Sequence, residues 1–292
     1  MKESVRQLII GLTTYVVLFA LLIVGSFLDL KIAQAVSIPG NFFSVITKAV
    51  GKMPAFLIMA ASCAILVRCA QNKECNIVLK RFFIVLYACL GLVSAMFGFL
   101  DCVALIFKKP AQQYFVSLLC AGLVYVLFMA DISKFCKQEF ERYKKWAFSV
   151  CIIVGIVAVV TYSMKFICQR ATLIDILENG ATFSPWYHIT KFSGGWAMPD
   201  NRTALAFTGW ILLTLTKIHP RMAGKELLFD FANIAFILLI MIGNLISGVY
   251  FVSDIAIGGL IGFTITLVVK LLAFGSDGDR IALSERNILN KL

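Results

Sequence analysis

W-A-M-P-D-N-R-T-A-L-A-F, residues Trp196 to Phe207, is the stretch around which this chain is organised. Its polar Pro-Asp-Asn-Arg-Thr step leads directly into an apolar run that starts at Thr203, so we expect a helix to begin here at a membrane surface. The first N–H groups of a helix have no partner within the helix, and the helix dipole places positive charge beside them. The stretch therefore predicts a helix start that is suited to an anion.

The composition is that of an integral membrane protein. Of 292 residues, 60% are hydrophobic and 15% are charged, which is far from the usual composition of a soluble domain. The net charge of +11 would suit a nucleic acid, but the Lys and Arg residues lie between apolar runs. Membrane topology and lipid headgroups explain such basic residues better. We therefore expect membrane lipids, and not nucleic acid, as partners.

Apolar stretches predict an all-α bundle of about eight transmembrane helices. The eight candidates are Leu8 to Phe27, Met53 to Val67, Phe82 to Phe107, Tyr114 to Ala130, Ala147 to Met164, Thr203 to Thr216, Leu227 to Tyr250 and Asp254 to Phe274. Short connections between them favour one transmembrane domain over residues 1–275. Residues 276–292 are polar and charged, and we expect them to form a cytoplasmic tail.

The distribution of basic residues predicts the orientation. If the N-terminus is cytoplasmic, two thirds of the 27 Lys and Arg residues fall in cytoplasmic segments, as the positive-inside rule requires. Both termini are then cytoplasmic. Lys165, Arg170, Tyr250 and the loop of residues 183–202 lie on the extracytoplasmic side.

Three stretches together resemble the type-2 phosphatidic acid phosphatase family, especially its members from Gram-positive bacteria. They are F-S-P-W-Y (Phe183 to Tyr187), the run from Pro199 to Phe207, and S-G-V-Y-F-V-S-D-I-A-I-G-G-L-I-G (Ser247 to Gly262). The resemblance places a phosphatase-like core at about residues 113–275, while the earlier half of the chain matches only in hydropathy. It implies a bacterial plasma-membrane protein with an extracytoplasmic site, in agreement with the orientation from charge.

In that family, three motifs meet at the outer membrane face. A Lys followed seven residues later by Arg-Pro clamps the phosphate, and the His of a Pro-Ser-Gly-His helix start protonates the leaving group. In the third motif, Ser-Arg is followed by five residues, a His, three residues and an Asp that orients this nucleophilic His. Phosphoryl transfer needs such parts: fixed cations, a nucleophile and a general acid.

Only Lys165, Pro199 and Asp254 match the family at their motif positions. The other eight positions hold different residues: Thr172, Leu173, Asp200, Asn201, Arg202, Gly243, Asn244 and Tyr250. Arg202 stands in place of the acid but holds its proton too tightly to donate it. Tyr250 stands in place of the nucleophile, and its ordinary pKa of about 10 is too high for that role. We therefore predict that no catalytic group is intact.

Asp200 also opposes phosphate binding, because a carboxylate at a helix start accepts the free N–H groups itself. We expect it to be the N-cap of the following helix, or else to pair with Arg202 or Lys165. Lys165, Arg170 and Arg202 are the candidates for holding a lipid phosphate, with Arg170 replacing part of the lost clamp. The alternative is that these three are ordinary cations at the membrane rim. No metal and no cofactor is predicted.

These features favour a pseudophosphatase, which is either a scaffold with a membrane-protein partner or a non-hydrolysing binder of lipid phosphate. The first alternative is an active phosphatase for phosphatidic acid or a prenyl (di)phosphate, with His188 or Tyr250 as a displaced catalytic group. The second is a lipid or small-molecule transporter that uses Asp101, because a carboxylate inside an apolar run is a functional candidate. Asp101 could instead bind a Ser or Thr of a neighbouring helix, or Lys108.

Overall fold

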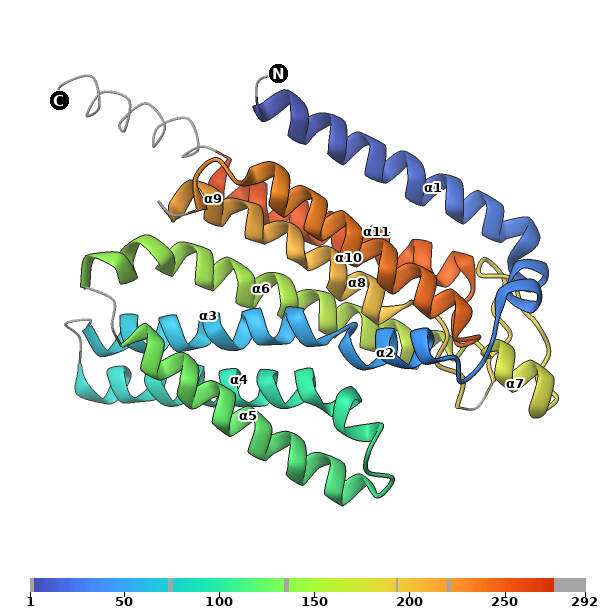
Figure 1. Cartoon of the computed structure of the whole chain (residues 1–292), viewed down its shortest axis with the longest axis horizontal. Coiled ribbons are helices and arrows are strands. Elements are labelled where there is room, and N and C mark those ends of the chain that lie inside the picture. The colour runs from blue at the N-terminus through green and yellow to red at the C-terminus, as the bar shows by residue number, and fades with distance from the viewer. Residues whose placement is uncertain (1–2, 73–75, 134–136, 193, 220–221, 276–292) are drawn as a thin grey trace.

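The computed structural model describes residues 3–72, 76–133, 137–192, 194–219 and 222–275 (Figure 1). Within these ranges every regular element is helical: α1 (Glu3–Val36), α2 (Phe42–Val50), α3 (Met53–Asn72), α4 (Ile77–Ala104), α5 (Pro110–Ile132), α6 (Lys137–Cys168), α7 (Leu173–Glu178), α8 (Asn201–Phe207), the 3₁₀-helix η1 (Thr208–Thr214), α9 (Leu215–Ile218), α10 (Glu226–Ile246) and α11 (Val252–Phe274). The predicted all-α class is confirmed. The tail predicted over residues 276–292 lies outside the described residues.

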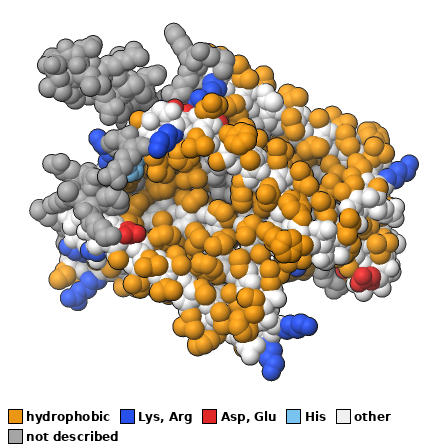
Figure 2. Space-filling view, viewed as in Figure 1, with side chains coloured by type: hydrophobic (Ala, Val, Ile, Leu, Met, Phe, Trp, Pro, Cys, Tyr) orange, Lys and Arg blue, Asp and Glu red, His pale blue; other side chains and the backbone are white. Residues whose placement is uncertain are grey.

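Seven helical segments of the described chain are long and apolar enough to cross a membrane. Large hydrophobic side chains are exposed along them, such as Phe27 and Leu272, and Figure 2 shows one face that is mostly hydrophobic, with many of its Lys and Arg side chains near the edges. An exposed apolar surface of this extent fits lipid and not water. The protein is therefore a helical integral membrane protein.

The eighth predicted span, Thr203 to Thr216, is helical but broken. It is divided among α8, η1 and α9, each of which is too short to cross a membrane. Threonine hydroxyls within it donate to carbonyls three residues back, from Thr208 to Leu205 at 2.6 Å and from Thr214 to Ile211 at 2.6 Å. Such bonds compete with the α-helical ladder and bend helices, and the sequence count took no account of them.

Helix α8 is packed in the middle of the bundle, and all seven of its residues are buried. Two glycines of α11 allow this close approach. A Cβ atom on Gly258 would lie 2.2 Å from the carbonyl oxygen of Asp200, and one on Gly262 would lie 2.1 Å from that of Ala204. Backbone therefore lies directly against backbone, as is common where membrane helices pack through small residues. This contact holds the polar residues at the start of α8 inside the bundle.

The beginning of α1 and the end of α11 lie at the same end of the bundle (Figure 1). The Lys270 ammonium donates to the Gln7 side-chain oxygen at 3.4 Å, and Arg6 pairs with Asp230 at the start of α10 at 3.3 Å. Helix α7 lies at the opposite end. The start of α1 and the end of α11 thus lie at one end of the bundle, and the cytoplasmic location of both chain ends stays a prediction.

Candidate functional site

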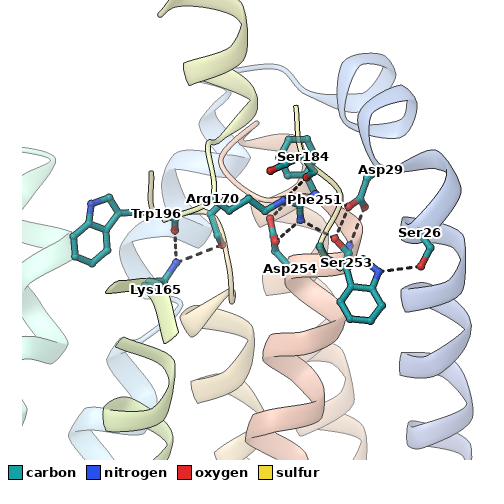
Figure 3. Close-up of polar contacts among 11 residues, drawn as sticks. Ser26, Asp29, Lys165, Arg170, Ser184, Trp196, Phe251, Ser253 and Asp254 are labelled. Atoms are coloured by element: carbon teal, nitrogen blue, oxygen red, sulfur yellow. Dashed lines mark hydrogen bonds and ion pairs between the residues drawn. The ribbon is translucent and has the colours of Figure 1, made fainter. Parts of the chain in front are cut away.

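Arg170 forms the centre of a buried ionic network at the end of the bundle that carries α7 (Figure 3). One terminal nitrogen donates to Asp254 Oδ1 at 2.6 Å and to Ser253 Oγ at 2.8 Å. The other donates to Asp29 Oδ2 at 3.0 Å, and Nε donates to the Ser184 carbonyl at 3.0 Å. Only 1% of the Arg170 side chain is exposed. The guanidinium is therefore held on each of its three nitrogens.

The two carboxylates that bind Arg170 are fixed by the start of α11. Asp254 accepts the Phe251 backbone N–H at 2.9 Å with its other oxygen, and Asp29 Oδ1 accepts the Ser253 backbone N–H at 3.0 Å. Helix α1 approaches closely here because residue 25 is Gly, and a Cβ atom there would lie 2.8 Å from Ser253 N. The sequence predicted that Arg170 binds phosphate, but in the structure its side chain connects α1 to α11.

Asp200 caps α8, which confirms the N-cap that the sequence predicted. Its carboxylate accepts the Arg202 backbone N–H at 3.0 Å, the Asn244 amide at 2.7 Å and the Thr203 hydroxyl. Its own backbone N–H donates to the Asp254 carbonyl at 3.0 Å. The side chain is fully buried. The protein's own carboxylate thus fills the helix start where the family pattern implies a bound phosphate.

Tyr250 lies beside Arg202. Its hydroxyl accepts from the Arg202 guanidinium at 3.2 Å and faces Asn201 Oδ1 at 3.3 Å. Burial raises the pKa of Tyr250 above its ordinary value, although the charge of Arg202 acts in the opposite direction. A phenol with a raised pKa stays protonated near neutral pH and is a poor nucleophile.

Lys165, near the end of α6, reaches the same group of residues from the other side. Its ammonium lies 4.7 Å from the centre of the Tyr250 ring. It donates to the carbonyls of Trp196 and Ala197 in the segment before α8, and only 3% of the residue is exposed. The Lys165 ammonium, which the sequence assigned to phosphate, is therefore bound by backbone carbonyls instead.

Asp101 of α4 connects the polar residues around Tyr250 to the junction of α2 and α3. Its Oδ2 lies 3.0 Å from the Lys52 ammonium and 3.4 Å from the Arg202 guanidinium. The expected partners, a Ser or Thr hydroxyl or Lys108, are not the ones the structure provides. Arg202 Nε is buried and has no hydrogen-bond partner among the described residues. Arg202 thus keeps one unused donor next to a second cation.

The remaining motif positions have packing roles. Thr172 caps α7 and exchanges hydrogen bonds with Asp175, and Leu173 is buried in a hydrophobic cluster with Phe251. A Cβ atom on Gly243 would lie 2.0 Å from the Thr47 hydroxyl, because α2 crosses α10 at this point. The structure brings the second and third motifs and Lys165 together, and it leaves Thr172 and Leu173 outside that group.

His188 is exposed in the loop between α7 and α8, where its backbone N–H donates to the Pro185 carbonyl at 3.0 Å. No described contact joins its side chain to the group around Tyr250. No set of three His, Cys, Asp or Glu side chains in the described ranges is arranged to hold a metal ion.

Sequence reasoning missed Asp29 and Lys52 as members of the site. Asp29 falls just beyond the predicted end of the first span, and Lys52 separates two apolar helices. The rule that selected Asp101, a charge among apolar residues, would have selected both. Neither belongs to a motif of the resembled family, so the alignment of motifs passed over them.

Comparison with known proteins finds no match: no family model, no curated protein and no solved structure matches this chain. The fold and the site define a class, namely a helical integral membrane protein whose polar centre is paired within itself except at Arg202 Nε.

Proposed function

We propose that this protein is a pseudophosphatase: a membrane protein built like a lipid-phosphate phosphatase that does not hydrolyse phosphate esters. The observation that carries the proposal is the state of Asp254, which matches the residue that orients the nucleophile in the resembled family. Here both of its oxygens are used, by Arg170 and by the Phe251 backbone N–H. The carboxylate has no imidazole to orient, and it holds a cation instead.

The other catalytic requirements are also unmet. The position of the nucleophile holds Tyr250, which is 5% exposed and has a raised pKa. The position of the general acid holds Arg202, which does not release a proton near neutral pH. The helix start that would receive the phosphoryl oxygens is occupied by the Asp200 carboxylate, which would also repel a phosphate dianion. These features support inertness independently of one another.

A scaffolding role follows from what the polar groups hold together. The Arg170 network joins α1, α11 and the loop that contains Ser184, while Asp200 and Asn244 join α8 to α10. We propose that this paired centre stabilises an extracytoplasmic surface for a membrane-protein partner or for lipid headgroups, in a bacterial plasma membrane. A transporter is less favoured, because Asp101 is bound by two cations and is not a free carrier group.

Phosphate release by the purified protein tests the proposal. With short-chain phosphatidic acid or a prenyl diphosphate as substrate, in detergent or nanodiscs, we expect no release above that of empty nanodiscs. Turnover that disappears in Tyr250→Phe or His188→Ala would overturn the proposal and establish a displaced catalytic group. Turnover that persists in both variants would also overturn the proposal. The exception is equal phosphate release by an unrelated membrane protein purified in the same way, which would identify a contaminating phosphatase.

Restoring the eight motif residues would not be enough to restore activity. Serine at position 243 would place its side chain on the Thr47 hydroxyl, since even a Cβ atom would lie 2.0 Å away. Histidine at position 250 would leave Asp254 still paired with Arg170. The packing around the motif positions thus fits the residues that this chain has, which supports a structural role for this centre.

A further inference from the structure

We propose that this protein retains a phosphate-bearing membrane lipid at its side, with the headgroup at Lys52 and Arg202 and one acyl chain in a crevice between α3, η1 and α10. The inference deepens the proposed function and rests on it for the class of ligand, a lipid that carries phosphate. It moves the predicted phosphate site away from Lys165 and Arg170, whose donors are already used.

The crevice has a volume of about 260 Å³ and almost entirely apolar walls. Pro54 and Ile58 of α3 form one wall, Leu205 and Leu212 of the broken helix form a second, and Phe236 of α10 contributes to the third. These helices belong to the membrane-spanning part of the chain, so hydrocarbon, and not water, surrounds the opening. A flexible apolar chain can fill such a crevice without burying a polar group that lacks a hydrogen bond.

The crevice exists because the helix is broken and because residue 209 is glycine. A Cβ atom on Gly209 would lie 2.4 Å from Asn233 Oδ1, so any larger residue would displace Asn233 or protrude into the opening. The 3₁₀ turn of η1 is narrower than an α-helix and leaves more space beside it. Both features are local to this segment, which gives the crevice a definite place along the bundle.

Positive charge is placed one helical turn from the apolar walls. Lys52 directly precedes α3, whose residue Pro54 lines the crevice, and Arg202 lies three residues before Leu205 on α8. At a rise of 1.5 Å per residue, the backbone of each of these residues lies roughly 3–5 Å along the helix from the nearest lining residue. Arg202 is also packed on the α2–α3 junction, since a Cβ atom on Gly51 would lie 3.1 Å from its Cδ. Both cations therefore lie beside the α2–α3 junction, where the lining of the crevice begins at Pro54.

An unpaired donor of Arg202 favours an anion at this point. Lys52 and Arg202 share the carboxylate of Asp101, and the charge of the buried Asp200 carboxylate also acts on Arg202. Arg202 Nε is buried without a partner, and the residue is 7% exposed. A phosphate oxygen would satisfy this donor, in the manner usual for Arg and phosphate. The adjoining apolar crevice selects a lipid over a free phosphate ion.

Photo-crosslinking tests the inference. The full-length protein would be placed in phosphatidylcholine nanodiscs that contain a trace of phosphatidic acid with a diazirine in its acyl chain, and the crosslinked peptides would be mapped by mass spectrometry. We expect crosslinks on residues 54–58, 205–212 and 229–236. Unlabelled phosphatidic acid should compete, while phosphatidylcholine and inorganic phosphate should not. Crosslinks spread evenly over the lipid-facing helices would overturn the proposal.

Two pairs of matched variants separate the chain site from the headgroup site. Ala232 and Ala235 are both exposed on α10, but only Ala232 lines the crevice, so Ala232→Phe should abolish the specific crosslinks and Ala235→Phe should not. Lys52→Gln should reduce crosslinking about tenfold, the loss expected for one charge-assisted hydrogen bond. Lys109→Gln, at an exposed lysine, should leave it unchanged.

Equal crosslinking in the members of either pair would refute the corresponding half of the site. The outcome is independent of the hydrolysis assay. Specific crosslinking together with lipid hydrolysis would refute the pseudophosphatase and leave the lateral site standing. Inertness without specific crosslinking would refute the lateral site alone.

Discussion

At the residue scale, the protein depends on charges that are buried in pairs. Arg170 is bound by Asp29 and Asp254, and all three side chains are at most 1% exposed. An ion pair that is removed from water loses much of its attraction to the cost of desolvation, but the loss of one partner leaves an unpaired buried charge. A single substitution in this network should therefore lower the stability of the folded protein.

Replacing Arg170 by Gln should destabilise the protein strongly. The change leaves Asp29 and Asp254 facing each other without a cation, and breaking a buried pair costs about 3–5 kcal/mol. Thermal unfolding in detergent, followed by tryptophan fluorescence, would show a lowered midpoint. Adding Asp29→Asn to Arg170→Gln should recover part of the loss, because it removes one of the two unpaired charges.

Lys109→Gln is the control for loss of one positive charge, and its midpoint should match that of the unaltered protein. The sequence alone suggested that Arg170 binds phosphate. If that were its role, Arg170→Gln would weaken lipid binding and leave the unfolding midpoint close to that of the unaltered protein, in contradiction of the structure.

At the element scale, the broken helix α8–η1–α9 determines where the site lies. It is held against α11 by glycines that permit backbone contact, and against α10 by the Asn244 side chain, which donates to Asp200 at 2.7 Å. Hydropathy correctly located this segment as Thr203 to Thr216 but described it as a span like the others. Its irregular 3₁₀ turn depends on hydroxyl-to-carbonyl bonds and on neighbouring helices, which a hydropathy count does not contain.

Gly262→Ala should destabilise the packing of α8 on α11. The new Cβ atom would lie 2.1 Å from the Ala204 carbonyl oxygen, and this is a backbone atom that cannot rotate away. Overpacking of a close contact costs typically about 1–3 kcal/mol. Urea or thermal unfolding of the purified variant would measure the loss.

Gly155→Ala is the matched control in α6, because no atom lies within 4 Å of the position its Cβ would take. Alanine is favoured over glycine in a helix by up to about 1 kcal/mol, so this variant should be as stable as the unaltered protein or more so. A Gly262→Ala protein as stable as Gly155→Ala would show that the two helices are not in contact as described.

At the scale of the whole molecule, the bundle separates two ends of different character. The start of α1 meets the end of α11 at one end, through Gln7 and Lys270, and α7 with the Arg170 network lies at the other. An odd number of long helices would place the two chain ends on opposite sides of a membrane. The predicted placement of both chain ends on one side therefore requires α8, η1 and α9 together to count as a further crossing.

Cysteine labelling tests this topology and its orientation. Glu178→Cys lies at the exposed end of α7, and Lys225→Cys lies at the exposed start of α10. In intact bacterial cells that express the protein, a membrane-impermeant maleimide should label position 178 at once and position 225 only after lysis. The unaltered protein serves as the blank for its own cysteines. Labelling of both positions in intact cells would contradict the fold, and the reverse pattern would contradict the orientation.

Much of the candidate site was predictable where it follows a motif. The N-cap role of Asp200 follows from residue type and position alone, since a carboxylate before a helix accepts its free N–H groups. The partners of Arg170 and Asp101 were not predictable. Arg170 lies 141 residues from Asp29 and 84 residues from Asp254 along the chain, so the choice of partner depends on which helices become neighbours.

The sequence by itself determined that this protein is helical and membrane-embedded, and where most of its helices lie, because burial in lipid is decided by the apolar length of each segment. The tertiary structure alone decided what the charges do. Glycine contacts set how closely α1, α8 and α11 approach one another, and that approach assigns Arg170 to two carboxylates and leaves Arg202 with an unused donor. Pairing between charges is a property of distance in space, which separation along a chain does not specify.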